Sequence, residues 1–254
     1  RGVMTVDLGS TYWMDAIRVA VFPRAGSRYR LDGYVMRASD GDRDASGELK
    51  WRPLSPLERE DNSVDQYRYV QDSFDPPRKM RFVDAIVTSS DPSRRGAYNT
   101  GPIIGEYMLY SRGYPAEVVM HSDLIDIQGR NPGRIRWDAY IPENTNIEIR
   151  TRTGSVLSKI VKYYDASGTE IPFSNWNSLF VTFKGPADTV FVPTTGWSSW
   201  SRPYVQPGDR VTSPGQRKFL QLQMRMSTVD KDVAALIRSI EIDLVDPVAG
   251  QLLA

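Results

Sequence analysis

Hydrophobic and polar positions alternate with a period of two in many short segments, and sustained 3.6-residue repeats are nearly absent. In residues 147–152 the apolar side chains fall on one face and the charged ones on the other, as in a strand with one solvated face. The same alternation, bounded by turn-forming residues, predicts strands at residues 4–8, 16–22, 33–37, 79–83, 104–110, 134–140, 146–152, 219–225 and 237–244. The pattern therefore predicts an all-β chain, with helix limited to short turns around residues 55–59 or 232–235.

The length of 254 residues suits two domains of ordinary size. Residues 113–117 (Gly-Tyr-Pro-Ala-Glu) follow a completed strand pattern near the middle, and a strand, a loop and a closing strand end each half. We therefore expect two tandem antiparallel β-sandwiches, at residues 1–113 and 114–254.

Composition removes several classes of function. The chain has no Cys and a single His, so disulfides, thiolate nucleophiles and multi-His metal sites are ruled out, and an enzyme is disfavoured. The formal net charge of +1 gives no field that attracts nucleic acid. No apolar run approaches the ~18–20 residues of a transmembrane helix, so no transmembrane segment is expected.

Four segments in the first half carry a family resemblance: Val6-Asp-Leu-Gly9, residues 34–41 ahead of Trp51, Arg68-Tyr-Val70, and residues 104–110. Their order resembles a discoidin domain, the coagulation-factor type C module with a galactose-binding-like fold, over about the first 110 residues. The resemblance implies a jelly-roll sandwich that binds glycans, lipid head groups or proteins through loops at one end, without catalysis. An expanded turn at residues 42–47 and the missing Cys pair depart from the family pattern.

The second half resembles a segment that follows discoidin-like modules in large bacterial surface proteins. That likeness implies an extracellular, cell-surface or periplasmic location.

Three carboxylates, Asp40, Asp42 and Asp44, are spaced two residues apart, like the start of a calcium loop. An EF-hand loop has Gly at its sixth position and Glu at its twelfth, where this chain has Ala45 and Trp51. Solvated turn carboxylates are therefore the preferred interpretation. Calcium is the weaker alternative, and no other cofactor is expected.

Trp197, Trp200 and Tyr204 lie among Ser, Gly, Arg and Pro in a predicted loop. Flat rings stack on the apolar faces of sugars, which makes these three residues candidates for carbohydrate binding. The alternative is a lid over the end of the sandwich, which the usual burial of large aromatic side chains favours.

Arginines at positions 130, 134, 136, 150 and 152 would form a basic stripe if their strands were adjacent. Interleaved Asp138 and Glu148 favour cross-strand ion pairs instead. His121-Ser122-Asp123 has the composition of a catalytic triad, but no nucleophile-elbow motif accompanies it. No catalytic residue is predicted, although a glycoside hydrolase needs only two carboxylates and stays the least favoured alternative.

The sequence thus favours a non-catalytic structural or scaffolding module of a secreted or cell-surface assembly, which contacts other protein subunits through loops and strand edges. The alternative is a module that recognises a polysaccharide through its loop aromatics, with binding lost in Trp197→Ala or Trp200→Ala. Because Val6–Gly9 comes early, we also expect the first sandwich to lack its opening strands. The apolar residues 248–254 lead us to expect that the chain is a portion of a longer polypeptide. A neighbouring subunit or upstream chain would supply the missing edge by β-augmentation.

Overall fold

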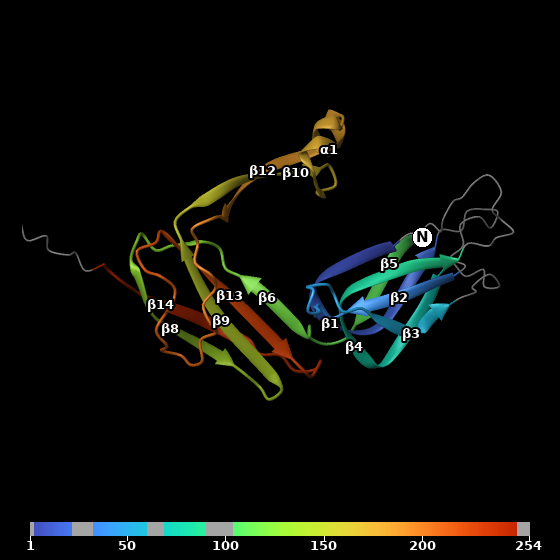
Figure 1. Ribbon diagram of the computed structural model, residues 1–254, viewed down its shortest axis with the longest axis horizontal. Coiled ribbons are helices and arrows are strands. Elements are labelled where there is room, and N and C mark those ends of the chain that lie inside the picture. Colours follow the sequence, from blue (N-terminus) through green and yellow to red (C-terminus); the bar gives the residue numbers. More distant parts are fainter. Residues whose placement is uncertain (1–2, 22–32, 60–68, 90–103, 248–254) are drawn as a thin grey trace, which may run out of the picture. The chain divides into compact units, whose positions relative to one another are not determined.

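Figure 1 shows a computed structural model that describes residues 3–21, 33–59, 69–89 and 104–247. The described residues are mostly strand, with helix confined to Phe173–Ser178 and Val181–Phe183, and the sheets are antiparallel, which confirms the predicted all-β class. The apolar segment 248–254 lies outside the described residues.

The chain divides into two compact units. Unit 1 comprises residues 1–119, 139–147 and 225–236, and unit 2 comprises residues 120–138, 148–224 and 237–254. The boundary expected near residue 113 stays a prediction.

Two long strands organise unit 1. β1 (Val3–Val21) pairs with β4 (Tyr69–Ser89) along most of its length, with shifts in register between Asp7 and Tyr12 and between Met14 and Ala16. At the first shift Gly9 takes a positive φ of 77°, a conformation that suits glycine. Each long strand is thereby divided into two segments that pair with different neighbours.

The remaining strands of unit 1 extend these two segments. β2 (Gly33–Ser39) pairs with the end of β4 and with β3 (Arg52–Arg59), whereas β5 (Ile104–Ser111) pairs with the second half of β1. The core between them contains Met14, Ile17, Val19, Met36, Ala38, Leu54, Phe74, Met80, Val83 and Ala85. These side chains come from alternate strand positions, as the sequence pattern predicts.

The two predicted helical turns are absent from their expected places. Residues 55–59 belong to β3, where Glu58 and Arg59 lie opposite Val35 and Tyr34 of β2, and residues 232–235 form a turn and an irregular segment. Pairing of β3 with β2 before this segment and at its end holds it extended, which overrides its weak helical preference.

Unit 2 is built around β8 (Asn131–Tyr140), β9 (Thr145–Gly154), β13 (Phe219–Thr228) and β14 (Leu236–Val245), together with β6 (Glu117–His121) and β7 (Ile125–Asp126). Several of these strands begin or end in unit 1. β13 pairs with β6, β7 and β9, and β8 pairs with β14. The buried side chains include Ile127, Ile135, Ile149, Leu220 and Leu222.

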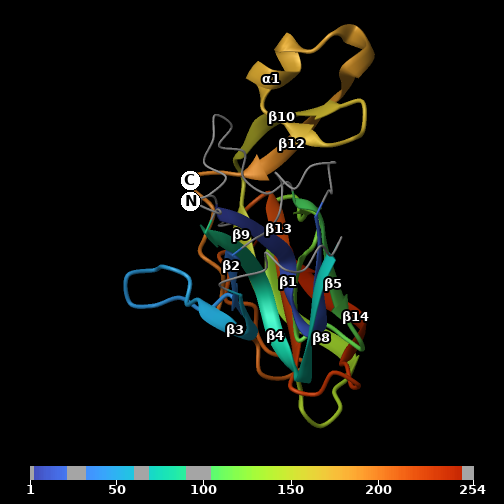
Figure 2. The same cartoon turned by 90° about the vertical axis from the view of Figure 1, so that its right-hand side faces the viewer.

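One part of unit 2 forms a separate three-stranded sheet, which we call the arm. It consists of β10 (Leu157–Asp165), β11 (Glu170–Ile171) and β12 (Lys184–Pro193), with the short helix α1 (Phe173–Ser178) and a 3₁₀ turn at Val181–Phe183 between β11 and β12. Figures 1 and 2 show the arm standing clear of the other strands of the unit.

Among the described residues, no helix has the length and apolar character needed to cross a membrane.

Candidate functional site

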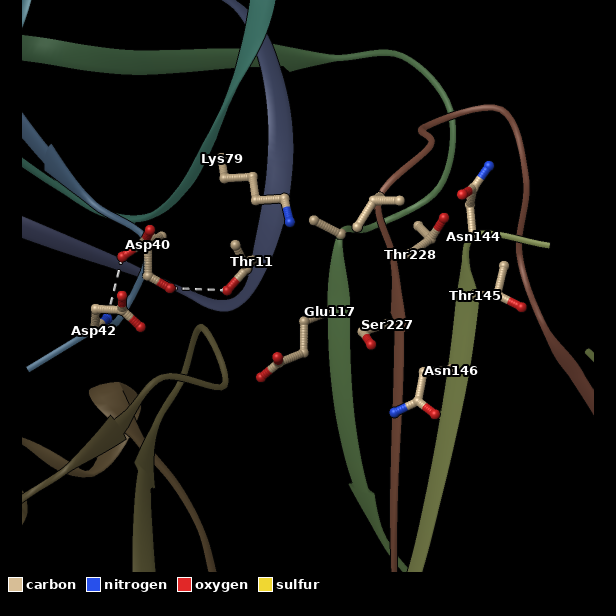
Figure 3. Close-up of a pocket in the computed structure, with 12 residues that line it drawn as sticks. Thr11, Asp40, Asp42, Lys79, Glu117, Asn144, Thr145, Asn146, Ser227 and Thr228 are labelled. Carbon is tan, nitrogen blue, oxygen red and sulfur yellow. Dashed lines mark hydrogen bonds between the residues drawn. The ribbon is translucent and has the colours of Figure 1, made fainter. Parts of the chain in front are cut away.

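A polar cleft of about 500 Å³ lies in unit 1 (Figure 3). Its volume is within the range of small-ligand sites. Carboxylates, amides, hydroxyls and one ammonium line it, from Thr11, Asp40, Asp42, Lys79, Glu117, Asn144, Thr145, Asn146, Ser227 and Thr228. Two of the residues singled out from the sequence, Asp40 and Asp42, therefore share this cleft.

Turns hold the carboxylates at one side of the cleft. Thr11, in the irregular segment of β1, donates its hydroxyl to the carbonyl of Asp40 at 3.0 Å. The amide of Asp42 donates to Oδ1 of Asp40 at 3.2 Å, a local turn typical of aspartate. The loop after β2 is thereby fixed against β1, and both side chains face the cleft (Figure 3).

The opposite side comes from two chain reversals. Asn144 takes a positive φ of 67° in the turn between β8 and β9, and its carbonyl accepts a hydrogen bond from Val229 N at 3.0 Å. Thr228 N donates to the carbonyl of Ala116 at 2.9 Å. The hydroxyl and amide groups on this side are therefore held by ordered backbone.

Asp44, the third aspartate of the predicted triplet, is not among the residues that line the cleft. The carboxylate of Asp44 accepts hydrogen bonds from the amides of Ser46 and Glu48 and from the Ser46 hydroxyl. The Ser46 hydroxyl is the main reason that the pKa of Asp44 is lowered. Asp44 thus closes its own loop, and the part of the chain that the structure describes holds no cluster of three acidic or imidazole ligands.

The predicted aromatic residues form a layered stack in unit 2. The guanidinium carbon of Arg152 lies 4.4 Å from the ring centre of Trp200 and 5.3 Å from that of Trp197. His121 stacks on Trp200, with 5.4 Å between ring centres and 23° between planes. Arg152 Nε and Nη2 both donate to Oε1 of Gln221, at 3.0 and 2.7 Å. Burial lowers the pKa of Arg152, which nevertheless stays a cation at neutral pH.

The loop that carries these tryptophans is bound to β9. The amides of Ser198, Ser201 and Tyr204 donate to the carbonyls of Thr153, Thr151 and Ile149, and the two serine hydroxyls accept from the amides of Thr153 and Thr151. Gly154 is required beside Trp197, because a Cβ at this position would lie 2.3 Å from its ring. This arrangement resembles the lid that the sequence offered as the alternative.

Tyr204 differs from the two tryptophans because its side chain is buried. Its side chain is 7% exposed, and its hydroxyl lies 2.6 Å from Oγ1 of Thr151 and accepts from Thr212 N. Out of reach of a ligand, Tyr204 packs in the interior of unit 2.

Sequence reasoning missed the partners of the stack. Arg152 was expected in a cross-strand ion pair, but it bonds to Gln221. Arg136 does form a cross-strand ion pair with Asp243, whereas Arg150 pairs with Glu148 of its own strand. The side chains of His121, Ser122 and Asp123 are not arranged as a triad: the Ser122 hydroxyl donates to the backbone carbonyl of Asp123. The one sequence feature that pointed toward Arg152 was its alternation with Arg150 on the polar face of β9.

No family model matches this chain, and no curated protein matches it. Among solved structures, the crystal structure of an F-lectin (fucolectin) from striped bass (Morone saxatilis) serum matches 96% of this chain and 82% of that chain, with 11% identity and a TM-score of 0.22. A likeness of this size decides neither the fold nor the ligand, and the discoidin resemblance stays a prediction.

Proposed function

We propose that this chain is a non-catalytic binding module that recognises a neutral polysaccharide in the polar cleft of unit 1. The observation that carries the proposal is the lining of that cleft, where carboxylate, amide and hydroxyl groups converge. Sugar hydroxyls donate and accept hydrogen bonds together, so they match such a mixed set of partners. A polysaccharide ligand accords with the secreted or cell-surface location expected from the sequence.

The charges in the cleft select among saccharides. Asp40, Asp42 and Glu117 contribute three carboxylates against the single ammonium of Lys79. Glu117 is paired with Arg225 at 2.6 Å, and Lys79 lies 4.8 Å from the ring centre of Trp13. Arg52 Nη2 lies 4.0 Å from Oδ2 of Asp40 and compensates this carboxylate only in part. Asp40 and Asp42 together therefore disfavour a uronic acid or sulfated sugar, because like charges repel. We therefore expect a neutral chain.

The mode of binding follows from the side chains that are present. The lining residues include no aromatic ring, so hydrogen bonds rather than ring stacking would fix the sugar. This differs from the expectation that Trp197 and Trp200 bind the saccharide, since both rings already contact Arg152.

Isothermal titration calorimetry with neutral and uronic-acid oligosaccharides tests the proposal. We expect saturable binding of at least one neutral oligosaccharide and none of the acidic ones. Asp42→Ala and Asn146→Ala should each weaken binding about tenfold, since each removes hydrogen bonds worth about 1–1.5 kcal/mol. Both side chains are exposed, Asp42 in a loop and Asn146 near the start of β9, so the fold should survive.

Asp123→Ala, an exposed aspartate of unit 2, is the matched control and should bind like the parent chain. Absence of binding across the panel, or equal affinity in the two cleft variants and the control, would overturn the proposal.

A further inference from the structure

The arm of unit 2 exposes an unusual share of its apolar side chains. Exposed fractions are 81% for Phe180, 84% for Val181, 59% for Phe183 and Phe191, 55% for Phe173, 43% for Ile160 and 37% for Val161. Isolated apolar residues at a surface need no explanation, whereas several on one projecting element indicate an interaction site. Ile160 lies on the face of the sheet opposite Tyr163, and Val161 and Phe191 lie on the face that carries Tyr163. The other four belong to α1 and the segment that follows it.

Within the arm, packing is confined to one face near its tip. Tyr163 contacts Phe173 and Trp176, with ring centres 5.0 and 5.1 Å apart, and Trp176 Nε1 donates to the carbonyl of Gly185 at 3.2 Å. Lys184 Nζ lies 4.4 Å from the ring centre of Trp176. Thus α1 covers the face of the sheet that carries Tyr163. A small sheet needs an apolar layer on at least one face for stability, and the layer that α1 supplies is only six residues long.

The register of the arm defines its other face. Ser158 pairs with Val192, Ile160 with Val190 and Lys162 with Asp188. Paired residues share a face, and residues two apart on a strand share it as well. These six residues form what we call the open face. Each is exposed or half-buried.

The net charge of the arm restricts the class of partner that can cover the open face. The arm, residues 157–193, contains three lysines and three acidic residues, so its net charge is zero. A polyanion such as nucleic acid or an acidic polysaccharide is therefore a poor partner. On the open face a cation and an anion lie side by side, next to the apolar pair Ile160 and Val190.

We propose that a second copy of this chain covers the open face, so that two arms pack face to face as a symmetric dimer. A two-fold axis parallel to the strands would place β10 of one copy over β12 of the other. Ile160 then meets the partner's Val190, and Lys162 meets the partner's Asp188, each contact occurring twice. Lys162 also pairs with Glu170 of its own chain at 2.7 Å, so its ammonium would lie between two carboxylates.

The expected dimer is weak. The open face of a two-stranded ribbon is smaller than the ~800 Å² per partner of a standard interface, although apolar tip residues would add to it. Such a dimer would make the chain a structural subunit, the first function expected from the sequence. It does not depend on polysaccharide binding, and Asp42→Ala should associate like the parent chain.

Analytical ultracentrifugation over about 1–200 µM of the full chain measures this association. We expect a concentration-dependent monomer–dimer equilibrium. Ile160→Lys should raise the dissociation constant at least tenfold, because it places two cations at the centre of the interface. Val205→Lys is the matched control: Val205 is 89% exposed in unit 2 outside the arm, and this variant should dimerise like the parent.

A charge exchange makes the test specific for the proposed pairing. Lys162→Asp alone and Asp188→Lys alone should each weaken self-association about tenfold, since two attractive contacts become repulsive. Mixed together, the two variants should form a heterodimer, because every pair across the interface is again opposite in charge. Any damage to the arm itself would persist on mixing, so recovery identifies the contact between copies.

Three results would overturn the inference. They are a monomer throughout the concentration range, a dimer that is indifferent to Ile160→Lys, and failure of the mixed charge variants to associate. Binding of the monomeric arm to phosphatidylcholine vesicles, lost in Phe180→Ser, would assign it to a lipid surface instead.

Discussion

Unit 2 contains two groups of aromatic side chains that differ in how their surfaces are used. In the stack, both tryptophan rings contact Arg152, and the indole N–H of Trp197 donates to the carbonyl of Val156 at 2.7 Å. At the tip of the arm, Phe180 and Phe183 are 81% and 59% exposed. The comparison teaches that aromatic content alone does not mark a binding surface. What separates the two groups is whether the chain itself supplies the contacts.

The difference has a sequence origin. In the loop of Trp197 and Trp200, the aromatic residues alternate with serines, and the hydroxyls of Ser198 and Ser201 bind the loop to β9. In residues 179–183, Leu-Phe-Val-Thr-Phe, apolar side chains follow one another with a single hydroxyl among them. Such a segment has little with which to anchor itself, and its apolar groups stay available for a partner.

The largest effect is expected from breaking the stack. Arg152→Ala should lower the free energy of unfolding by about 3 kcal/mol, because it removes two cation–π contacts and two hydrogen bonds and leaves Gln221 Oε1 without these donors. Urea denaturation followed by circular dichroism measures it. Arg136→Ala, which removes an ion pair between side chains that are 48% and 43% exposed, should cost far less, because solvent screens exposed ion pairs. Equal losses in the two variants would show that the stack contributes nothing special.

A smaller effect on the free energy of unfolding is expected from removing either of two tyrosine hydroxyls, which differ in their hydrogen bonding. The Tyr107 hydroxyl in unit 1 is buried and lacks a hydrogen-bond partner among the described residues, whereas that of Tyr204 is bonded to Thr151. Tyr107→Phe should therefore raise the free energy of unfolding by up to about 1 kcal/mol at pH 7, and Tyr204→Phe should lower it by about that amount. Denaturant titrations of both variants at pH 7 give the two values.

The pH dependence of Tyr107 has a definite sign. Burial first, and the charge of Asp84 second, raise its pKa to about 12, above the ordinary value of 10.0. The unfolded chain therefore loses this proton before the folded one does, and stability is lost as pH rises from about 10 toward 12. Tyr107→Phe should show a shallower loss of stability between pH 9.5 and 11 than the parent chain. An unchanged slope would contradict the assigned pKa.

Local pattern predicted many of the strands but missed β3, β6, β10 and β12, and it did not predict which strands pair. Residues 4–8 and 16–22 were expected as separate strands, and residues 4–8 and 16–21 belong to the single long β1, because the irregularity between Asp7 and Tyr12 does not end the strand. The arm was not predicted. α1 is only six residues long, Phe173–Ser178, and depends on contacts with Tyr163 that lie ten residues or more away in sequence.

The candidate sites show the same limit. Asp40 and Asp42 were singled out as turn carboxylates and do line the cleft, but Asn144 comes from a distant turn and Asn146 and Glu117 from the starts of β9 and β6, which no local motif marks. Trp197 and Trp200 were recognised as a loop pair, yet their central partner Arg152 lies more than forty residues earlier. Residue types predicted chemistry, and only the folded chain brings these residues together.

The smallest effect is expected at the tip of the arm, and it tests the other half of the comparison. Replacing Phe180 and Val181 together with serine should change the free energy of unfolding by less than about 0.5 kcal/mol in dilute solution, since both side chains are more than 80% exposed in the single chain. Trp200→Ser in the stack should cost several times more, because that ring contacts both Arg152 and His121. Urea denaturation at low protein concentration, where association does not contribute, compares the two variants. A loss above about 1 kcal/mol at the tip would mean that the arm packs against its own chain in solution, and the distinction between satisfied and available aromatic side chains would fail.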